Sequence, residues 1–176
     1  MTPSAQIVLM MAVLALVTAA AVIDWRSRRI PNLLVLGGML AGLALQAGFN
    51  GLDGTQAALG GWAVGFALLI PGYALGQTGA GDVKLMASAG IFLGPATTLV
   101  AGLSSILVGA LAALLIALFG RGANPWGRYG NMLRCLLATG KAAYLPPHAG
   151  EVMALSFPYA VAIAAGTVLA LYWSLM

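Results

Sequence analysis

Apolar residues fill six long stretches of the chain, and each stretch ends at glycine, proline or a charged residue. The stretches run roughly over Ser4–Ile23, Leu33–Phe49, Thr55–Leu75, Val83–Leu93, Thr97–Phe119 and Val152–Tyr172. A helix needs about 20 apolar residues to cross the hydrocarbon core of a bilayer. The pattern therefore predicts an all-α, polytopic membrane protein with six transmembrane helices, forming a single domain over residues 1–176.

The fourth stretch is short for a transmembrane helix. About eleven residues at about 1.5 Å each reach about 16 Å, roughly half of the hydrocarbon thickness. Either this helix starts below the membrane surface, or the chain continues past Gly94-Pro95 as a single span from Val83 to Phe119. The single span would divide the basic residues across the membrane, so a hairpin at Gly94-Pro95 is the preferred interpretation.

Composition agrees with a protein whose solvent is lipid. Hydrophobic residues make up 61% of the 176 residues and charged residues only 7%, against about 45–50% and about 25% in soluble domains. This excludes an ordinary water-soluble globule. The net charge of +4 is also too thinly spread for a nucleic-acid-binding surface.

Basic residues predict the orientation in the membrane. They form three clusters, namely Arg26, Arg28 and Arg29; Lys84; and Arg121, Arg128, Arg134 and Lys141. The alternate loops carry no basic residue, since Asn50–Gly54 holds only Asp53. By the positive-inside rule the basic loops are cytoplasmic, and both termini lie outside.

The segment Gly120–Gly150 is the one long loop, and part of it has helical periodicity. Its apolar residues recur at helical spacing, at Trp126, Tyr129, Leu133, Leu136 and Leu137. The polar residues Arg128, Asn131 and Arg134 occupy positions between them. We expect an amphipathic helix lying in the cytoplasmic interface, with a disordered linker as the alternative.

The chain has only four acidic residues, and two have simple local explanations. Asp53 sits in a glycine-flanked turn, where it shapes the turn or caps the following helix. Glu151 precedes the last apolar stretch, where it favours a helix N-terminus. Neither requires a catalytic role.

Asp24 follows the first apolar stretch without a break. The negative end of a helix dipole disfavours a carboxylate there, so local helix physics does not explain it. One alternative is a surface ion pair with Arg28, four residues on. Acids at the edge of the membrane are otherwise candidates for functional sites.

Asp82 follows Gly79-Ala80-Gly81 and precedes Val83 and Lys84. An ordinary N-cap is one interpretation, because Asp is among the best N-cap residues. The two glycines before it go beyond what a cap needs. They allow backbone or an extended substrate to come close.

The predicted topology brings Asp24 and Asp82 to the same membrane face. Two carboxyl groups a few ångströms apart do not both ionise, so one holds a proton while the other accepts one. This arrangement suits general acid and base catalysis of water attack on a peptide carbonyl, as in aspartic proteases. The single His148 and single Cys135 favour neither nucleophilic catalysis nor a zinc site, so no metal or cofactor is expected.

The run Gly79-Ala80-Gly81-Asp82-Val83-Lys84-Leu85 resembles the GxGD motif of the type IV prepilin peptidases, which are membrane aspartyl peptidases. Asp24 followed by Ile30-Pro31-Asn32 resembles the first-aspartate segment of that family. The segment Phe157–Gly166 resembles the last helix of its short members, which are associated with tight-adherence (Flp) pili.

The resemblance implies that Asp24 and Asp82 are the catalytic pair. Gly79, Gly81, Lys84 and Asn32 would lie on the substrate side, with the glycines shaping the loop before Asp82 and Lys84 acting as an anchor or an electrostatic bias. The implied substrate is a prepilin or pseudopilin with a basic leader and an apolar helix, cleaved at the cytoplasmic face of the bacterial inner membrane. The cytoplasmic insert with paired cysteines of the long members is absent, so we expect no N-methyltransferase activity.

Two other functions remain open from the residues alone. A small proton- or cation-coupled carrier would use Asp24 and Asp82 as a relay, although a relay more naturally lies near the bilayer midplane. A noncatalytic assembly subunit would pair Asp24 with Arg28 and use Asp82 only as a cap.

Overall fold

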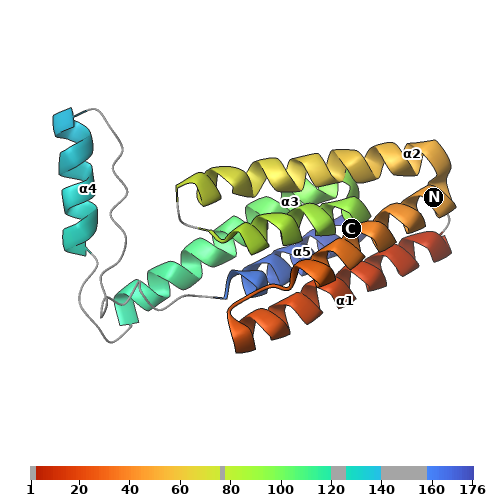
Figure 1. The fold of residues 1–176 in the computed structure, drawn as a ribbon, viewed down its shortest axis with the longest axis horizontal. Helices are drawn as coiled ribbons and strands as arrows, with labels where there is room; N and C mark the ends of the chain where they lie inside the picture. The colour runs from red at the N-terminus through yellow and green to blue at the C-terminus, as the bar shows by residue number, and fades with distance from the viewer. Residues whose placement is uncertain (1–2, 76–77, 120–125, 140–157) are drawn as a thin grey trace. The chain divides into compact units, whose positions relative to one another are not determined.

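The computed structural model describes residues 3–75, 78–119, 126–139 and 158–176. All regular elements in these ranges are helices: α1 (Pro3–Ser27), α2 (Asn32–Ala74), α3 (Ala80–Phe119), α4 (Trp126–Thr139) and α5 (Tyr159–Leu175) (Figure 1). The predicted all-α class is confirmed for the described part of the chain.

Three of the described helices are long and apolar enough to cross a membrane. They are α1, α2 and the part of α3 over Ala80–Ile116, while α5 is a shorter apolar helix. Large apolar side chains are exposed on all of them, including Leu33, Leu52 and Leu107. Exposed apolar surface on this scale is unfavourable in water and favourable in lipid, as expected of an integral membrane protein.

Both long helices are interrupted by one glycine with non-helical backbone angles. Gly51 in α2 has φ 59° and ψ −134°, and Gly94 in α3 has φ 72° and ψ 171°. A positive φ strains any residue with a Cβ atom, so glycine is required at both positions. The chain reverses direction at each glycine (Figure 1), so α2 and α3 each consist of two antiparallel segments.

Two contacts fix these reversals. The Thr98 hydroxyl donates hydrogen bonds to the carbonyl oxygens of Gly94 (2.6 Å) and Gly90 (3.4 Å), the latter across the turn. A Cβ atom at Gly54 would collide with the backbone of Gln46, on the other side of the Gly51 turn. The chain thus makes a hairpin at Gly94-Pro95 and not a continuous helix from Val83 to Phe119.

The chain divides into two compact units. One comprises Met1–Gly109 and Pro158–Met176, and so contains α1, α2, most of α3 and α5. The other comprises Ala110–Phe157, with the end of α3 and α4. Within the first unit, α1 packs against both α2 and α5.

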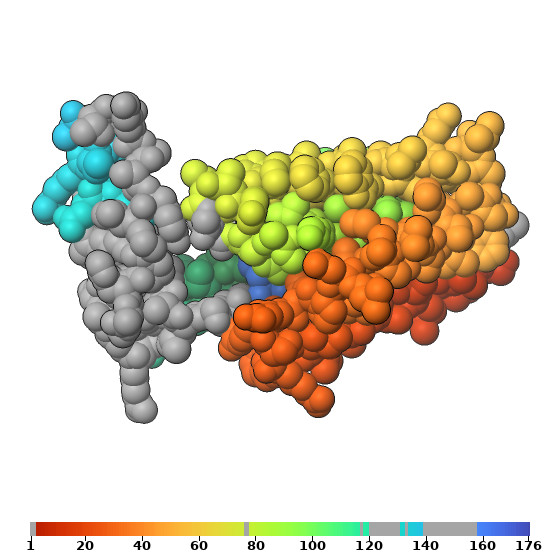
Figure 2. All heavy atoms as spheres, in the orientation of Figure 1, coloured from red at the N-terminus to blue at the C-terminus, as the bar shows by residue number. Residues whose placement is uncertain are grey.

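The first segment of α3 forms the centre of the larger unit. Its residues are buried almost without interruption from Leu85 to Phe92. Close packing around it depends on small residues, because a Cβ atom at Gly61 of α2 would collide with the carbonyl group of Gly90. Figure 2 shows part of α3 between the two segments of α2. The short fourth stretch is therefore an inner helix that the others surround.

A buried glutamine compensates for the break in α3. Pro95 has no N–H group, so the Ile91 carbonyl lacks its usual helical donor. The Gln46 side chain, only 4% exposed, donates hydrogen bonds to the carbonyl oxygens of Ile91 (3.3 Å) and Phe92 (3.2 Å). Asn50 in turn donates to Gln46 Oε1 at 3.0 Å. The turn is thus tied to α2 by side chains that the sequence pattern did not single out.

Several helix boundaries differ from the apolar stretches. The first stretch ends at Ile23, but α1 continues to Ser27, because polar residues complete its last turn where the helix leaves the core. The last described helix begins at Tyr159, and the preceding part of the sixth stretch lies outside the described residues, as do Glu151 and His148.

The segment expected to be an amphipathic helix contains α4. The exposed side chains on α4 include both Asn131 and Arg134 and the apolar Leu137. Arg121 and Lys141, from the same predicted loop, lie outside the described residues.

Candidate active site

Three helices of the larger unit meet at one level. A Cβ atom at Gly38 of α2 would lie 2.8 Å from the Leu16 side chain of α1 and 2.9 Å from the Ser88 hydroxyl of α3. Asp24 lies eight residues after Leu16, and Asp82 lies six residues before Ser88. Because α1 and the first segment of α3 run in opposite directions, both aspartates lie toward the same end of the bundle. Asp24 is about 12 Å and Asp82 about 9 Å from the level of Gly38.

Asp24 is buried, with 8% of its surface exposed. Its Oδ2 accepts a hydrogen bond of 3.4 Å from the backbone N–H of Ala160 in the first turn of α5. The first N–H groups of a helix have no partner within the helix, and Pro158, which precedes α5, offers no capping side chain. Asp24 therefore supplies a cap from another helix, and it is not the surface residue that the ion-pair alternative requires.

Asp82 lies within the first turn of α3, so the N-cap interpretation is wrong in position. Its Oδ2 accepts a hydrogen bond of 3.0 Å from the backbone N–H of Gly79. The N–H groups of Asp82 and Val83 donate to the Gly79 carbonyl oxygen at 3.1 and 3.3 Å. This resembles one half of a capping box, in which an acidic side chain reaches back to the N–H that precedes the helix.

The two carboxyl groups lie at the same end of the apolar bundle, where two negative charges would repel each other. Each carboxylate also receives an N–H from the beginning of a helix, where the helix dipole is positive. The two helix N-termini partly offset the repulsion between like charges, which allows two acids to remain at one end of an apolar bundle.

The two glycines before Asp82 leave space around it. A Cβ atom at Gly79 would lie 3.0 Å from Asp82 Oδ2, and one at Gly81 would lie 3.3 Å from Cβ of Ile30. Gly79 itself is exposed. A side chain at Gly79 would thus crowd the Asp82 carboxylate, and one at Gly81 would crowd Ile30.

Asn32 and Lys84 join the beginnings of α2 and α3. Lys84 Nζ donates a hydrogen bond of 3.2 Å to Asn32 Oδ1, and both side chains are exposed. Of the residues predicted to be functional, Asp24, Asp82, Asn32 and Lys84 lie at one end of the bundle, with the Gly79 N–H bound to Asp82 and Gly81 beside Ile30. Asn32 and Lys84 form a polar bridge at the helix start that carries Asp82.

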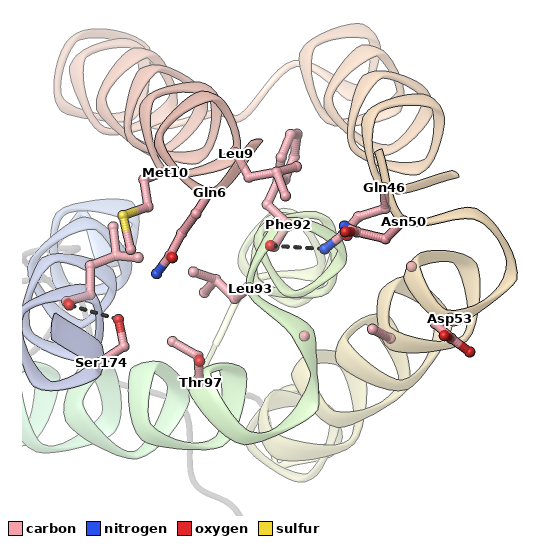
Figure 3. Close-up of a pocket in the computed structure, with 14 residues that line it drawn as sticks. Gln6, Leu9, Met10, Gln46, Asn50, Asp53, Phe92, Leu93, Thr97 and Ser174 are labelled. Carbon is pink, nitrogen blue, oxygen red and sulfur yellow. Dashed lines mark hydrogen bonds between the residues drawn. The ribbon is translucent and has the colours of Figure 1, made fainter. Parts of the chain in front are cut away.

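A cavity of about 460 Å³ lies at the other end of the larger unit (Figure 3). Its lining includes Gln6 near the start of α1, Gly94 at the turn of α3 and Ser174 near the end of α5, far along each helix from the aspartates. In the part of the chain that the structure describes, no three His, Cys, Asp or Glu residues are grouped to hold a metal ion.

Comparison with known proteins identifies the family. The sequence model of the type IV leader peptidase family matches residues 11–116, more than half of the chain and the part that holds both Asp24 and Asp82. The chain belongs to the type IV leader peptidase family. No curated protein and no solved structure matches it.

Family membership implies a protease with a general role in processing prepilin-type leaders, and it agrees with the apolar helices of an integral membrane protein. The resemblance drawn from the GxGD run and the Asp24 segment is thereby confirmed at the level of the family. Membership does not favour the carrier or the assembly subunit.

Sequence reasoning missed the contribution of α5 to this end of the bundle. The group that contacts Asp24 is a backbone N–H, which every residue except proline has, so no side chain signals it. The available signal was Pro158, which marks a helix start and leaves the next N–H groups without a local cap.

Proposed function

We propose that the chain is a membrane aspartyl endopeptidase that removes the leader peptide from prepilin-like precursors, with Asp24 and Asp82 as its catalytic pair. The observation that carries the proposal is the placement of two acids, the buried Asp24 and Asp82, at the same end of an apolar bundle although 58 positions separate them in the sequence. A buried acid in an apolar bundle is costly unless it has a function or a partner.

The proposed reaction needs one ionised and one protonated carboxyl group. The ionised carboxylate takes a proton from water while the water oxygen bonds to the peptide carbonyl carbon. The protonated carboxyl gives its proton to the carbonyl oxygen, which forms a tetrahedral diol. The carboxyl group that took the water proton then gives it to the peptide nitrogen, the other carboxylate takes a proton from a hydroxyl of the diol, and the C–N bond breaks to release an acid and an amine. The pair regains its starting protonation, and no metal or cofactor takes part.

We further propose six membrane passes, one for each of α1 and α5 and two for each of α2 and α3. The reversals at Gly51 and Gly94 support this count, because each long helix returns to the end from which it started. The exposed side chains of Arg26, Arg29 and Lys84 lie at the aspartate end. The positive-inside rule then places this end in the cytoplasm and both termini outside the inner membrane, with α4 in the cytoplasmic interface.

The substrate is proposed to be a prepilin or pseudopilin with a short basic leader before an apolar helix. Its apolar helix remains in lipid while the scissile bond reaches Asp24 and Asp82 near the membrane surface. The approach beside Gly79 and Gly81 suits an extended backbone, and Asn32 and Lys84 border it. The site is proposed to hydrolyse the leader without N-methylation, as in the short form associated with Flp pili.

Cleavage of a purified prepilin in proteoliposomes tests the proposal. Asp24→Asn and Asp82→Asn are each expected to abolish cleavage, because an amide neither takes up nor releases the proton. Both variants are expected to fold, since the Asn side-chain oxygen can still accept the N–H of Ala160 or Gly79.

Asp53→Asn is the matched control, since Asp53 lies at the other end of the bundle. It is expected to cleave at the wild-type rate. Full activity in either of the other two variants would refute the catalytic pair.

A further inference from the structure

Tyr159 lies where α5 meets the aspartates. It is the first residue of α5, and the next residue, Ala160, donates its N–H to Asp24. The Tyr159 ring packs closely on Gly109 of α3, where a Cβ atom would lie 2.6 Å from Cε2 of the ring. The side chain is half-buried at this contact.

The hairpin of α3 places this ring at the level of Asp82. Asp82 lies 12 residues before the turn at Gly94, and Gly109 lies 15 residues after it. At about 1.5 Å per residue, the two positions are about 18 Å and about 22 Å from the turn, on antiparallel segments.

The Tyr159 hydroxyl has an unused capacity for hydrogen bonding. Among the residues that the structure describes, no group forms a hydrogen bond with it, and because the side chain is only half-buried its partner can be water. Asp82 Oδ2 already accepts the Gly79 N–H. The other carboxylate oxygen of Asp82, Oδ1, can therefore accept a hydrogen bond from a group at this level.

We propose that Tyr159 is a positioning residue of the peptidase site, whose hydroxyl orients the Asp82 carboxyl group through a bridging water molecule. A bridging water contributes nearly as much as a direct hydrogen bond and fits a pair that makes no direct one. Tyrosine suits this role because its hydroxyl both donates and accepts at neutral pH. This inference rests on the proposed function, because it assigns Tyr159 to the same reaction.

Kinetics of Tyr159→Phe test the proposal. Phenylalanine keeps the ring on Gly109 and removes only the hydroxyl. Loss of one hydrogen bond to an acidic group is expected to lower kcat roughly 10- to 100-fold. KM and the melting temperature are expected to stay at their wild-type values, since neither substrate binding nor packing uses the hydroxyl. Tyr172→Phe, the same change at the far end of α5, is the control and is expected to keep the wild-type kcat.

Wild-type kcat in Tyr159→Phe would overturn the proposal, because the hydroxyl would then have no role in the reaction. A fall in melting temperature or failure to fold would also overturn it, since the hydroxyl would then serve the structure. Parallel assays of Asp24→Asn and Asp82→Asn separate this result from the proposed function. If those variants are inactive and Tyr159→Phe is fully active, only the role of Tyr159 fails; if they are active, both proposals fail.

Discussion

The Asp24 carboxylate and the backbone N–H of Ala160 form a hydrogen bond between residues that lie 136 positions apart in the sequence. This bond joins the last turn of α1 to the first turn of α5 at the end of the bundle that holds Asp82. The same carboxylate thus has a structural contact and a proposed catalytic role, and variants can separate the two.

Asp24→Ala is expected to destabilise the bundle more than Asp24→Asn. Alanine leaves the Ala160 N–H buried without an acceptor, which costs about 1–3 kcal/mol, whereas the asparagine oxygen can still accept it. Thermal unfolding in detergent measures the difference. Equal melting temperatures for the two variants would show that the contact between α1 and α5 does not depend on this bond.

Gln46→Leu is expected to lower the melting temperature while sparing the peptidase reaction in the folded fraction. Its amide supplies the donor that Pro95 cannot supply to the Ile91 carbonyl, and losing it leaves buried carbonyl groups without partners, at about 1–3 kcal/mol. Gln56→Leu, at an exposed position of the same helix, is the control. A stability effect as large in Gln56→Leu would contradict the assignment.

Asn32→Ala and Lys84→Met are expected to act as a coupled pair. Each breaks the same exposed hydrogen bond between the starts of α2 and α3. Each is expected to lower kcat/KM roughly five-fold, equivalent to about 1 kcal/mol. The double variant is expected to lose no more than the larger single effect, because the shared bond is lost only once. Independent, multiplying effects would show that the two residues do not act through each other.

Labelling of single cysteines in a Cys135→Ser background tests the six passes. Asp53→Cys is expected to react with a membrane-impermeant maleimide on intact cells. Ser27→Cys and Leu75→Cys are expected to react only after permeabilisation, because α2 crosses the membrane and returns. Reaction of Leu75→Cys on the same side as Asp53→Cys would contradict a double crossing by α2.

Local features were predictable from the sequence. The apolar stretches that α2 and α3 contain are separated at Asn50–Gly54 and Gly94-Pro95, and the chain reverses in both places, because glycine and proline act on the backbone wherever they occur. The candidate acids were also visible, since so few charged residues occur in the chain. The position of Asp82 within its helix was not, because a carboxylate can cap from several positions.

Contacts that depend on distant backbone groups were not predictable. The Gln46 amide donates to carbonyl groups 45 and 46 residues further along the chain. Asp24 accepts a hydrogen bond from a backbone N–H group in another helix. Neither partner has a side-chain signature in the sequence. The depth of the first segment of α3 within the bundle likewise depends on how the other helices surround it, so its short apolar stretch was ambiguous on its own.

The contact between Gly61 and Gly90 has a mechanical consequence. With no side chains between the two backbones, α2 cannot roll or slide along α3 without carbonyl groups colliding. We therefore expect α2 and α3 to keep their relative position at this level. We expect any widening that admits a peptide to occur at the helix ends, and at one of those ends Asp24 and Asp82 lie.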